Sequence, residues 1–159
     1  MKSKALFLDR DGVINKEINY LYRIEDFIFN DGIFELCEKF IKKGYLIIVI
    51  TNQAGIAKGF YTEKDYTSLT NWMNDEFYKC GITISKVYHC PHHPDITGFC
   101  NCRKPNPQMI LDAESEFDLD LSESVLIGDK ISDIYAGINA KIGLNILISP
   151  NNLLTILKI

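Results

Sequence analysis

The stretch KALFLDRDG, residues 4–12, runs from an apolar segment straight into two aspartates. The apolar part, residues 4–8, predicts a short buried strand that ends at Asp9. Asp11 and Gly12 follow it, a pair that is also common in ordinary turns. A strand that ends in two acids indicates either such a turn or a polar site, and the other strands of the chain decide between the two.

Apolar runs and helical patterns alternate along the rest of the chain. Residues 45–50 are apolar throughout, which is typical of a parallel strand covered on both faces. Shorter runs predict strands at 85–88, 124–127 and 144–148. Helices are expected from Asp31-Gly32 to Gly44, from a Thr62 cap paired with Asp65 to Gly81, from Asn106 at the cap with Pro107 at the first helical position, over 131–141, and for one turn after Pro150.

This alternation predicts an α/β fold built on a doubly wound parallel sheet of the Rossmann type. We see no repeat or linker, so residues 1–159 are expected to form a single domain. Only 39 residues, 12–50, separate the first polar motif from the second, which leaves no room for a large cap domain. Ligands in such folds bind at the carboxyl ends of the strands.

The composition narrows the range of partners. Of 159 residues, 47% are hydrophobic and 24% charged, and the net charge of -4 argues against a nucleic-acid or anionic-membrane surface. No apolar run reaches the roughly 18 residues that span a membrane, and the start does not fit a signal peptide. We expect a cytoplasmic monomer that acts on a small molecule and binds neither nucleic acid nor membrane.

Polar residues follow each strand that could meet the first one. Thr51 ends the run 45–50, Asp129 follows 124–127, and Asp133 lies one helical turn further on. Several carboxylates at one sheet edge would repel each other unless a divalent cation joined them, and carboxylate oxygens with retained waters suit magnesium. Each residue alone could be a cap, a turn or a surface side chain, but their joint occurrence in order favours a site.

Such a site suits phosphoryl transfer. A carboxylate beside the metal can attack phosphorus and form an aspartyl-phosphate. Thr51 and Lys104 could hold the phosphoryl oxygens. Asp11, two residues past Asp9, could protonate the leaving oxygen and later activate water.

The set Asp9-x-Asp11-Gly, Thr51-Asn, Lys104-Pro and Gly128-Asp129-x-x-x-Asp133 resembles the haloacid dehalogenase (HAD) superfamily of phosphohydrolases, over residues 4–149. The resemblance implies Asp9 as nucleophile and magnesium ligand, and Asp11 as general acid and base with its backbone carbonyl on the metal. It implies Asp129 as a further magnesium contact with the Lys130 backbone nearby, while Asp133 orients Lys130 or a metal water rather than binding the metal directly. The residues that would face the substrate are Glu17, Asn19, Tyr20, Asn52, Gln53 and Arg103.

Longer stretches carry a narrower resemblance. FLDRDGVIN (7–15), TNQAGIAKG (51–59) and CPHHP (90–94) with CNCRKP (100–105) are similar to the family that removes the 7-phosphate of D-glycero-D-manno-heptose 1,7-bisphosphate. Those enzymes serve ADP- or GDP-heptose synthesis for lipopolysaccharide or surface polysaccharide. Histidinol-phosphate phosphatases of histidine biosynthesis share the cysteine loop, and the seven residues between His92 and Cys100 are closer to theirs. A phosphoacceptor receiver-like signalling domain is the alternative from another class.

Three of the five cysteines lie in one loop, residues 89–103. Cys90-x-His92 with Cys100-x-Cys102 offers three thiolates and one imidazole, a set that suits a closed, structural zinc site. His93 is the rival to His92 as ligand. Zinc there would fix the start of Arg103 and Lys104. The remaining cysteines, Cys37 and Cys80, fall on apolar helical stripes and are expected in the core.

Overall fold

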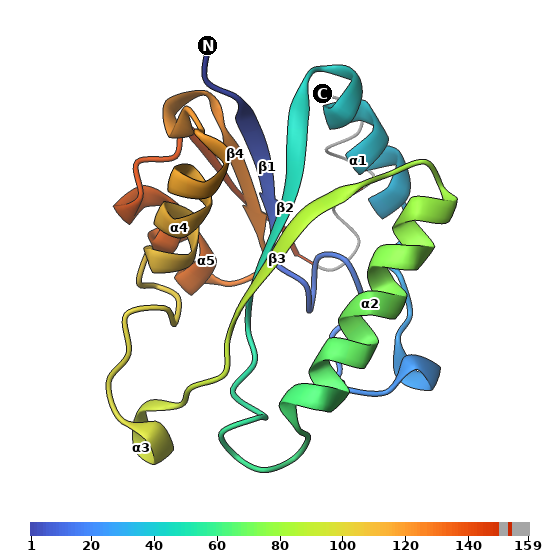
Figure 1. Cartoon of the computed structure of the whole chain (residues 1–159), viewed down its shortest axis with the longest axis vertical. Coiled ribbons are helices and arrows are strands. Elements are labelled where there is room, and N and C mark those ends of the chain that lie inside the picture. Colours follow the sequence, from blue (N-terminus) through green and yellow to red (C-terminus); the bar gives the residue numbers. More distant parts are fainter. Residues whose placement is uncertain (150–152, 154–159) are drawn as a thin grey trace.

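The computed structural model describes residues 1–149 and Leu153. Its strands form one parallel sheet in the order β3-β2-β1-β4-β5 (Figure 1). The strands are β1 (Lys4–Leu8), β2 (Tyr45–Asn52), β3 (Ile84–Cys90), β4 (Val125–Gly128) and β5 (Leu144–Leu147). The predicted doubly wound parallel sheet is confirmed, because the order starts in the middle of the sheet and grows toward both edges.

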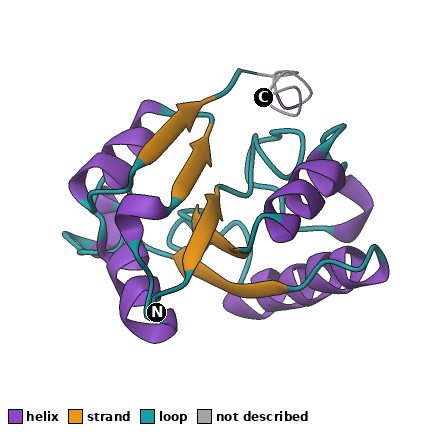
Figure 2. Cartoon of the chain, turned by 90° about the horizontal axis from the view of Figure 1, so that it is seen from above, coloured by secondary structure: helices purple, strands orange, loops and turns teal. Residues whose placement is uncertain are grey.

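Helices cover both faces of this sheet (Figure 2). They are α1 (Ile33–Lys42), α2 (Glu63–Lys79), the short α3 (Pro94–Thr97), α4 (Gln108–Phe117) and α5 (Ile131–Asn139), with 3-10 turns η1 (Ile24–Asp26) and η2 (Leu121–Glu123). The cap predicted at Thr62 is present, since its hydroxyl accepts from the Asp65 amide while the Asp65 carboxylate accepts from the Thr62 amide. Within the described residues no helix is long and apolar enough to cross a membrane.

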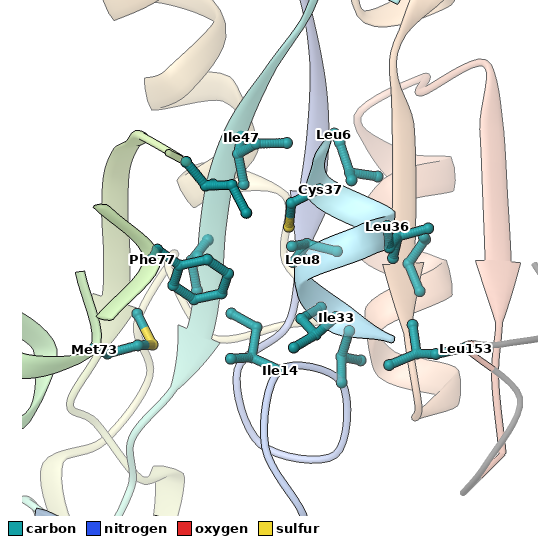
Figure 3. Close-up of a cluster of buried hydrophobic side chains, with 14 of the residues drawn as sticks. Leu6, Leu8, Ile14, Ile33, Leu36, Cys37, Ile47, Met73, Phe77 and Leu153 are labelled. Carbon is teal, nitrogen blue, oxygen red and sulfur yellow. The ribbon is translucent and has the colours of Figure 1, made fainter. Parts of the chain in front are cut away.

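The side chains of β1 alternate between two hydrophobic cores. Leu6 and Leu8 belong to the core beneath α1 and α2, a cluster that Figure 3 draws with Ile33 and Phe77 among its members. Ala5 and Phe7 point into the opposite core, under α4 and α5. Burying one leucine or phenylalanine side chain contributes roughly 1.5–3 kcal/mol. The strand that leads to Asp9 is therefore packed on both faces, and this packing fixes the position of its carboxyl end.

Cys80 is not a core residue, contrary to expectation. Cys37 is buried, but Cys80 is exposed. The apolar stripe of α2 runs through Tyr66, Leu69, Met73 and Phe77 and ends there, because Cys80 is already the C-cap residue.

The start of α4 also differs from the expected one. The helix begins at Gln108 with Pro107 at the cap position, one residue later than predicted. The Asn106 side chain, expected to cap it, instead donates to the Cys100 carbonyl at 3.0 Å. A contact with the cysteine loop thus takes the amide that would have capped the helix.

Other boundaries moved by a few residues. β3 extends to Cys90, so the cysteine loop expected at 89–103 begins inside a strand, and it contains α3, which was not predicted. Helix α5 ends at Asn139 rather than at Lys141, which has positive φ. The helical turn expected after Pro150 lies outside the described residues.

Candidate active site

The carboxyl ends of three neighbouring strands define the site. β1 lies between β2 and β4, so Asp9, Thr51 and Asp129, which end or follow these strands, come to the same sheet edge. Figure 1 shows the loops after β2 and β3 at this end of the sheet. Motifs that are far apart in the sequence therefore form one cluster in the fold.

Lys104 lies at the centre of this cluster. Its ammonium is 3.0 Å from Oδ1 of Asp9 and 2.6 Å from Oδ1 of Asp133, and it donates to the Ile50 carbonyl at 3.0 Å. The Asn52 side chain fixes the backbone of Lys104 from both sides, accepting from its amide at 3.1 Å and donating to its carbonyl at 3.4 Å. The 104–105 peptide bond is cis. A lysine with 4% exposure is thus held in one position.

Three carboxylates lie together here, and two of them contact this lysine. Ligand oxygens of Asp9, Asp129 and Asp133 lie within 4.8 Å of one another. Asp133 is placed by the Lys130 amide, which donates to its Oδ2 at 3.1 Å. Three negative charges against one positive charge leave two uncompensated when all groups are ionised. This excess matches the charge of one divalent cation.

Burial sets the electrostatics of the cluster. It raises the pKa of Asp9 well above the ordinary value, although Lys104 opposes the shift, and it raises the pKa of Asp129 as well. Burial alone would lower the pKa of Lys104, but Asp9 and Asp133 raise it above its usual range. Carboxylates that are costly to ionise without a counterion fit a cation-binding role.

Two features at Asp129 fit a metal ion. Its buried Oδ1 is without a hydrogen-bond partner among the described residues. On the other side, Gly12 has φ +92 and lies so close that a Cβ atom there would be 1.9 Å from Oδ2 of Asp129. An orphaned carboxylate oxygen among other acids is the donor that a hard cation such as Mg²⁺ takes.

Asp11 is held by a separate buried network. The guanidinium of Arg10 donates from Nε to Oδ1 and from Nη2 to Oδ2, both at 3.1 Å. The amides of Asn15 and Gln53 add bonds of 3.1 and 3.2 Å. The Gln53 amide also donates to the Thr51 hydroxyl at 2.8 Å. The side chain of Asp11 is therefore fixed in orientation, and it still lines the adjacent pocket.

A pocket of about 520 Å³ opens over the cluster. A smaller inner cavity next to it is lined by Asp9, Asp11, Lys104 and Asp133. Glu17 lies 4.0 Å from Lys130 at the wall of the larger pocket, and burial raises the pKa of its carboxyl against the opposing effect of Lys130. All residues predicted to face the substrate line this pocket: Glu17, Asn19, Tyr20, Asn52, Gln53 and Arg103.

The cysteine loop forms a compact cluster of its own. Ligand atoms of Cys90, His92, Cys100 and Cys102 all lie within 4.8 Å of one another. Nδ1 of His92 is 3.2 Å from Sγ of Cys102 and 3.4 Å from Sγ of Cys90. Three sulfurs and one imidazole nitrogen at this spacing have the donor chemistry of a tetrahedral zinc site.

His93 takes a different place from His92. It caps α3, where its Nδ1 accepts from the Asp95 amide at 3.2 Å, and it lines the large pocket. Arg103 follows Cys102 directly and donates to the His92 carbonyl at 3.4 Å. The cysteine cluster and the pocket wall are thus parts of one continuous segment.

Known proteins resemble this chain over most of its length. A D-glycero-α-D-manno-heptose-1,7-bisphosphate 7-phosphatase from Campylobacter jejuni is 55% identical over 149 residues, which cover 94% of this chain and 84% of that protein. The chain belongs to the heptose-1,7-bisphosphate 7-phosphatase family. A β-anomer enzyme of the same family, from Helicobacter pylori, is 46% identical over 96% of this chain and 88% of its own.

The fold of the heptose-bisphosphate phosphatase family is also seen in solved structures. The D,D-heptose 1,7-bisphosphate phosphatase from B. bronchiseptica, complexed with magnesium and phosphate, aligns with a TM-score of 0.81 at 27% identity, over 89% of this chain and 78% of that one. The HAD-hydrolase-like family matches residues 101–146. The HAD membership expected from the sequence is confirmed.

Several residues of this candidate site were not anticipated from the sequence. Arg10 is 1% exposed and braces Asp11. Tyr61 donates to Oε1 of Gln53, and Lys58 lines the large pocket. A sequence signal existed for Arg10, because an arginine directly after a buried strand and between two acids must be paired if it is buried. Tyr61 and Lys58 lie in an irregular loop that offers no periodic signal.

Proposed function

We propose that this protein is a magnesium-dependent phosphatase that removes the 7-phosphate of D-glycero-D-manno-heptose 1,7-bisphosphate. The observation that carries the proposal is the buried Lys104 ammonium between Asp9 and Asp133, beside the unpartnered oxygen of Asp129. The proposed nucleophile and phosphoryl-binding cation line one small cavity, with the candidate site for a divalent metal beside them and a pocket that could hold a sugar next to it. The family relationship supports the same reaction.

Asp9 is the proposed nucleophile. One of its carboxylate oxygens attacks phosphorus and forms a new P–O bond, while the bond between phosphorus and the C7 oxygen of the sugar breaks. Lys104, 3.0 Å from Asp9, compensates the charge of the transferred phosphoryl oxygens, and the Thr51 hydroxyl at the end of β2 binds another of them.

Asp11 is the proposed general acid and base. It gives its proton to the departing C7 oxygen, then takes a proton from the water that attacks the phosphorus of the aspartyl-phosphate. The bond between Asp9 and phosphorus breaks, and inorganic phosphate leaves. Arg10, Asn15 and Gln53 hold the Asp11 carboxyl in one orientation throughout.

Magnesium would be held by the carboxylates of Asp9 and Asp129 and the backbone carbonyl of Asp11, with the Lys130 backbone nearby. When bound, it neutralises charge on the phosphoryl group and on the nucleophile. Asp133 has a different proposed role, because its two oxygens already bind the Lys104 ammonium and the Lys130 amide. We infer that it orients both lysines and does not bind the metal directly.

Zinc in the Cys90, His92, Cys100 and Cys102 cluster would be structural. All four coordination positions would be filled by protein, so none remains for substrate. Its effect would be to fix where Arg103 and Lys104 begin, since Cys102 directly precedes them. The loop would otherwise be a long irregular connection between β3 and α4.

We further propose that residues 1–159 act as one catalytic domain, as a monomer in the cytoplasm, in the synthesis of nucleotide-activated heptose. The α anomer is the proposed substrate form, because three relatives named for the α anomer are 49–55% identical to this chain, while five named for the β anomer are 39–46% identical.

Phosphate release from both anomers of the bisphosphate and from histidinol phosphate tests this function. We expect the heptose substrate to be hydrolysed at least tenfold more efficiently than histidinol phosphate. Asp9→Asn should lose about 10⁴-fold or more of the turnover, while Asp75→Asn, on the exposed side of α2, serves as the matched control. Preference for histidinol phosphate would overturn the proposal, and a phosphorylated form that persists for minutes without turnover would indicate a signalling domain.

A further inference from the structure

Two loops meet at the mouth of the large pocket. Tyr20, in the loop after β1, and Lys58, in the loop after β2, both line it. The Lys58 ammonium donates to the Tyr20 hydroxyl at 2.5 Å and lies 4.9 Å from the centre of its ring. The Tyr20 ring also packs on Phe60, with ring centroids 4.6 Å apart. A tyrosine from one loop therefore fixes the position of a lysine from the other.

The backbone at this contact is unusual. Tyr20 has φ 56, in the left-handed region that aromatic residues rarely adopt. Gly59, directly after Lys58, has φ 75. A non-glycine residue holds such a conformation only where surrounding contacts stabilise it, and these positions cluster at ligand-binding sites.

The charges in the pocket are unequally paired. Of the cations that line it, Lys104 contacts Asp9 and Asp133, and Lys130 lies 4.0 Å from Glu17. Arg103 donates to the His92 carbonyl, on the cysteine loop. Among residues 1–149, no carboxylate lies within 4.0 Å of the Lys58 ammonium, whose contacts are with Tyr20. An ammonium has three protons to donate, and one is used here.

Lys58 is also set apart from the reaction centre. It lines the large pocket but not the inner cavity that Asp9, Lys104 and Asp133 share. Arg103 likewise lines the large pocket and not the inner cavity. A cation in this outer position is poorly placed for the phosphoryl group that Asp9 attacks, and well placed for an anionic group at the far end of the same substrate.

We propose that Lys58 binds the second phosphate of the substrate, the one that is not transferred, and that Tyr20 is its positioning residue. The inference rests on the proposed function, because it requires a bisphosphate. A phosphate dianion would take the free donors of the Lys58 ammonium in a charge-assisted contact. Lys58 then makes the enzyme prefer a bisphosphate to the corresponding monophosphate.

Steady-state kinetics with two substrates tests this assignment. The substrates are D-glycero-D-manno-heptose 1,7-bisphosphate and D-glycero-D-manno-heptose 7-phosphate, which lacks the second phosphate. For Lys58→Met we expect kcat/KM to fall about 10- to 100-fold on the bisphosphate, through KM, and to change less than about twofold on the monophosphate. Lys58→Arg should restore most of the loss, and Tyr20→Phe should give a smaller loss with the same substrate dependence.

Lys64→Met is the matched control, since Lys64 is an exposed lysine of α2 that does not line the pocket. Equal losses on both substrates, or no loss on the bisphosphate, would overturn the role of Lys58 and leave the proposed function intact. A wild-type protein that hydrolyses neither substrate would overturn the proposed function and this inference together.

Discussion

The ammonium of Lys104 lies 3.0 Å from a carboxylate oxygen of Asp9, and both side chains are almost fully buried although 95 positions separate them. Asp133 approaches the same ammonium to 2.6 Å. Buried charges are tolerated only when they are paired and hydrogen-bonded. The contact therefore links the stability of the fold to the chemistry at the end of β1.

Lys104→Met should lower both the stability of the fold and the turnover. Removing the cation leaves Asp9 and Asp133 buried without it, which should cost about 3–5 kcal/mol in the free energy of unfolding of the metal-free protein. Turnover should fall as well, because Lys104 is the cation proposed to bind the phosphoryl oxygens. Lys86→Met is the control, since the Lys86–Glu116 pair is exposed and screened by solvent, so that its loss should change stability little. Similar unfolding midpoints in urea for the two variants would contradict this expectation.

Gly12→Ala should impair the site by sterics. Its new methyl group would lie 1.9 Å from Oδ2 of Asp129, so the carboxylate or the turn must shift. A displacement of about 1 Å can cost about 100-fold in rate, and the magnesium concentration for half-maximal activity should rise as well. Gly81→Ala is the matched control, because Gly81 has φ +78, a similar left-handed strain, and nothing within 4 Å of its Cβ position. If both variants behave alike, the clash with Asp129 is not the cause.

As the pH is lowered, magnesium affinity should begin to fall at a higher pH than it would for carboxylates with ordinary pKa values. Burial raises the pKa of Asp9 and of Asp129 above their ordinary value of 3.8. Since the metal binds the ionised forms, protons compete with it at pH values above 3.8. Calorimetric titration with magnesium at descending pH should show weakening affinity and protons released on binding.

The same shifts act in the opposite sense on the metal-free fold. A raised pKa means that the folded state holds its proton more tightly than the unfolded state. The stabilising contribution of these groups is therefore complete below pH 3.8 and is lost as the pH rises through the raised values. Added magnesium should reverse this loss. A magnesium affinity that stays constant down to pH 4 in the titration would show that the carboxyls of Asp9 and Asp129 are not the metal ligands.

Zinc removal should change thiol reactivity in a defined pattern. Cys80 is exposed and should react with a thiol reagent at once, while Cys37 is buried with its pKa raised from 9.0 to about 12 and should stay inert. Cys90, Cys100 and Cys102 should become reactive only after chelation. Activity should then fall while magnesium affinity is largely kept.

Cys80→Ser supplies the control for this titration, because it removes the fast thiol without touching the cluster. Full turnover of the zinc-free protein would refute the proposed positioning of Arg103 and Lys104. Rapid labelling of the three cluster cysteines before chelation would argue against a zinc site.

Most of the fold could be predicted from the sequence because the strands are buried on both faces. A strand such as β2 then appears as a continuous apolar run, and its polar end marks the sheet edge. Periodicity fails at element ends, where Cys80 becomes a cap, and where a tertiary contact decides, as for Asn106. The candidate ligands and acids could be named from their place after strands, and their roles stay predictions.

Contacts between loops were beyond sequence reasoning. Arg10 reaches Asp11, Gln53 and the Leu21 carbonyl, and Lys58 reaches Tyr20 across 38 positions. Nothing in local spacing indicates which residues of two irregular loops will touch, because the sheet brings them together only after folding.

Covalent trapping on Asp9 is the most direct test of the proposed chemistry. The wild-type protein would be mixed with heptose bisphosphate and magnesium, quenched in acid during the first turnovers, reduced with borohydride and analysed by peptide mass spectrometry. We predict modification of Asp9 alone, absent in Asp9→Asn. An unmodified Asp9 in protein that releases phosphate under the same conditions would contradict the covalent mechanism.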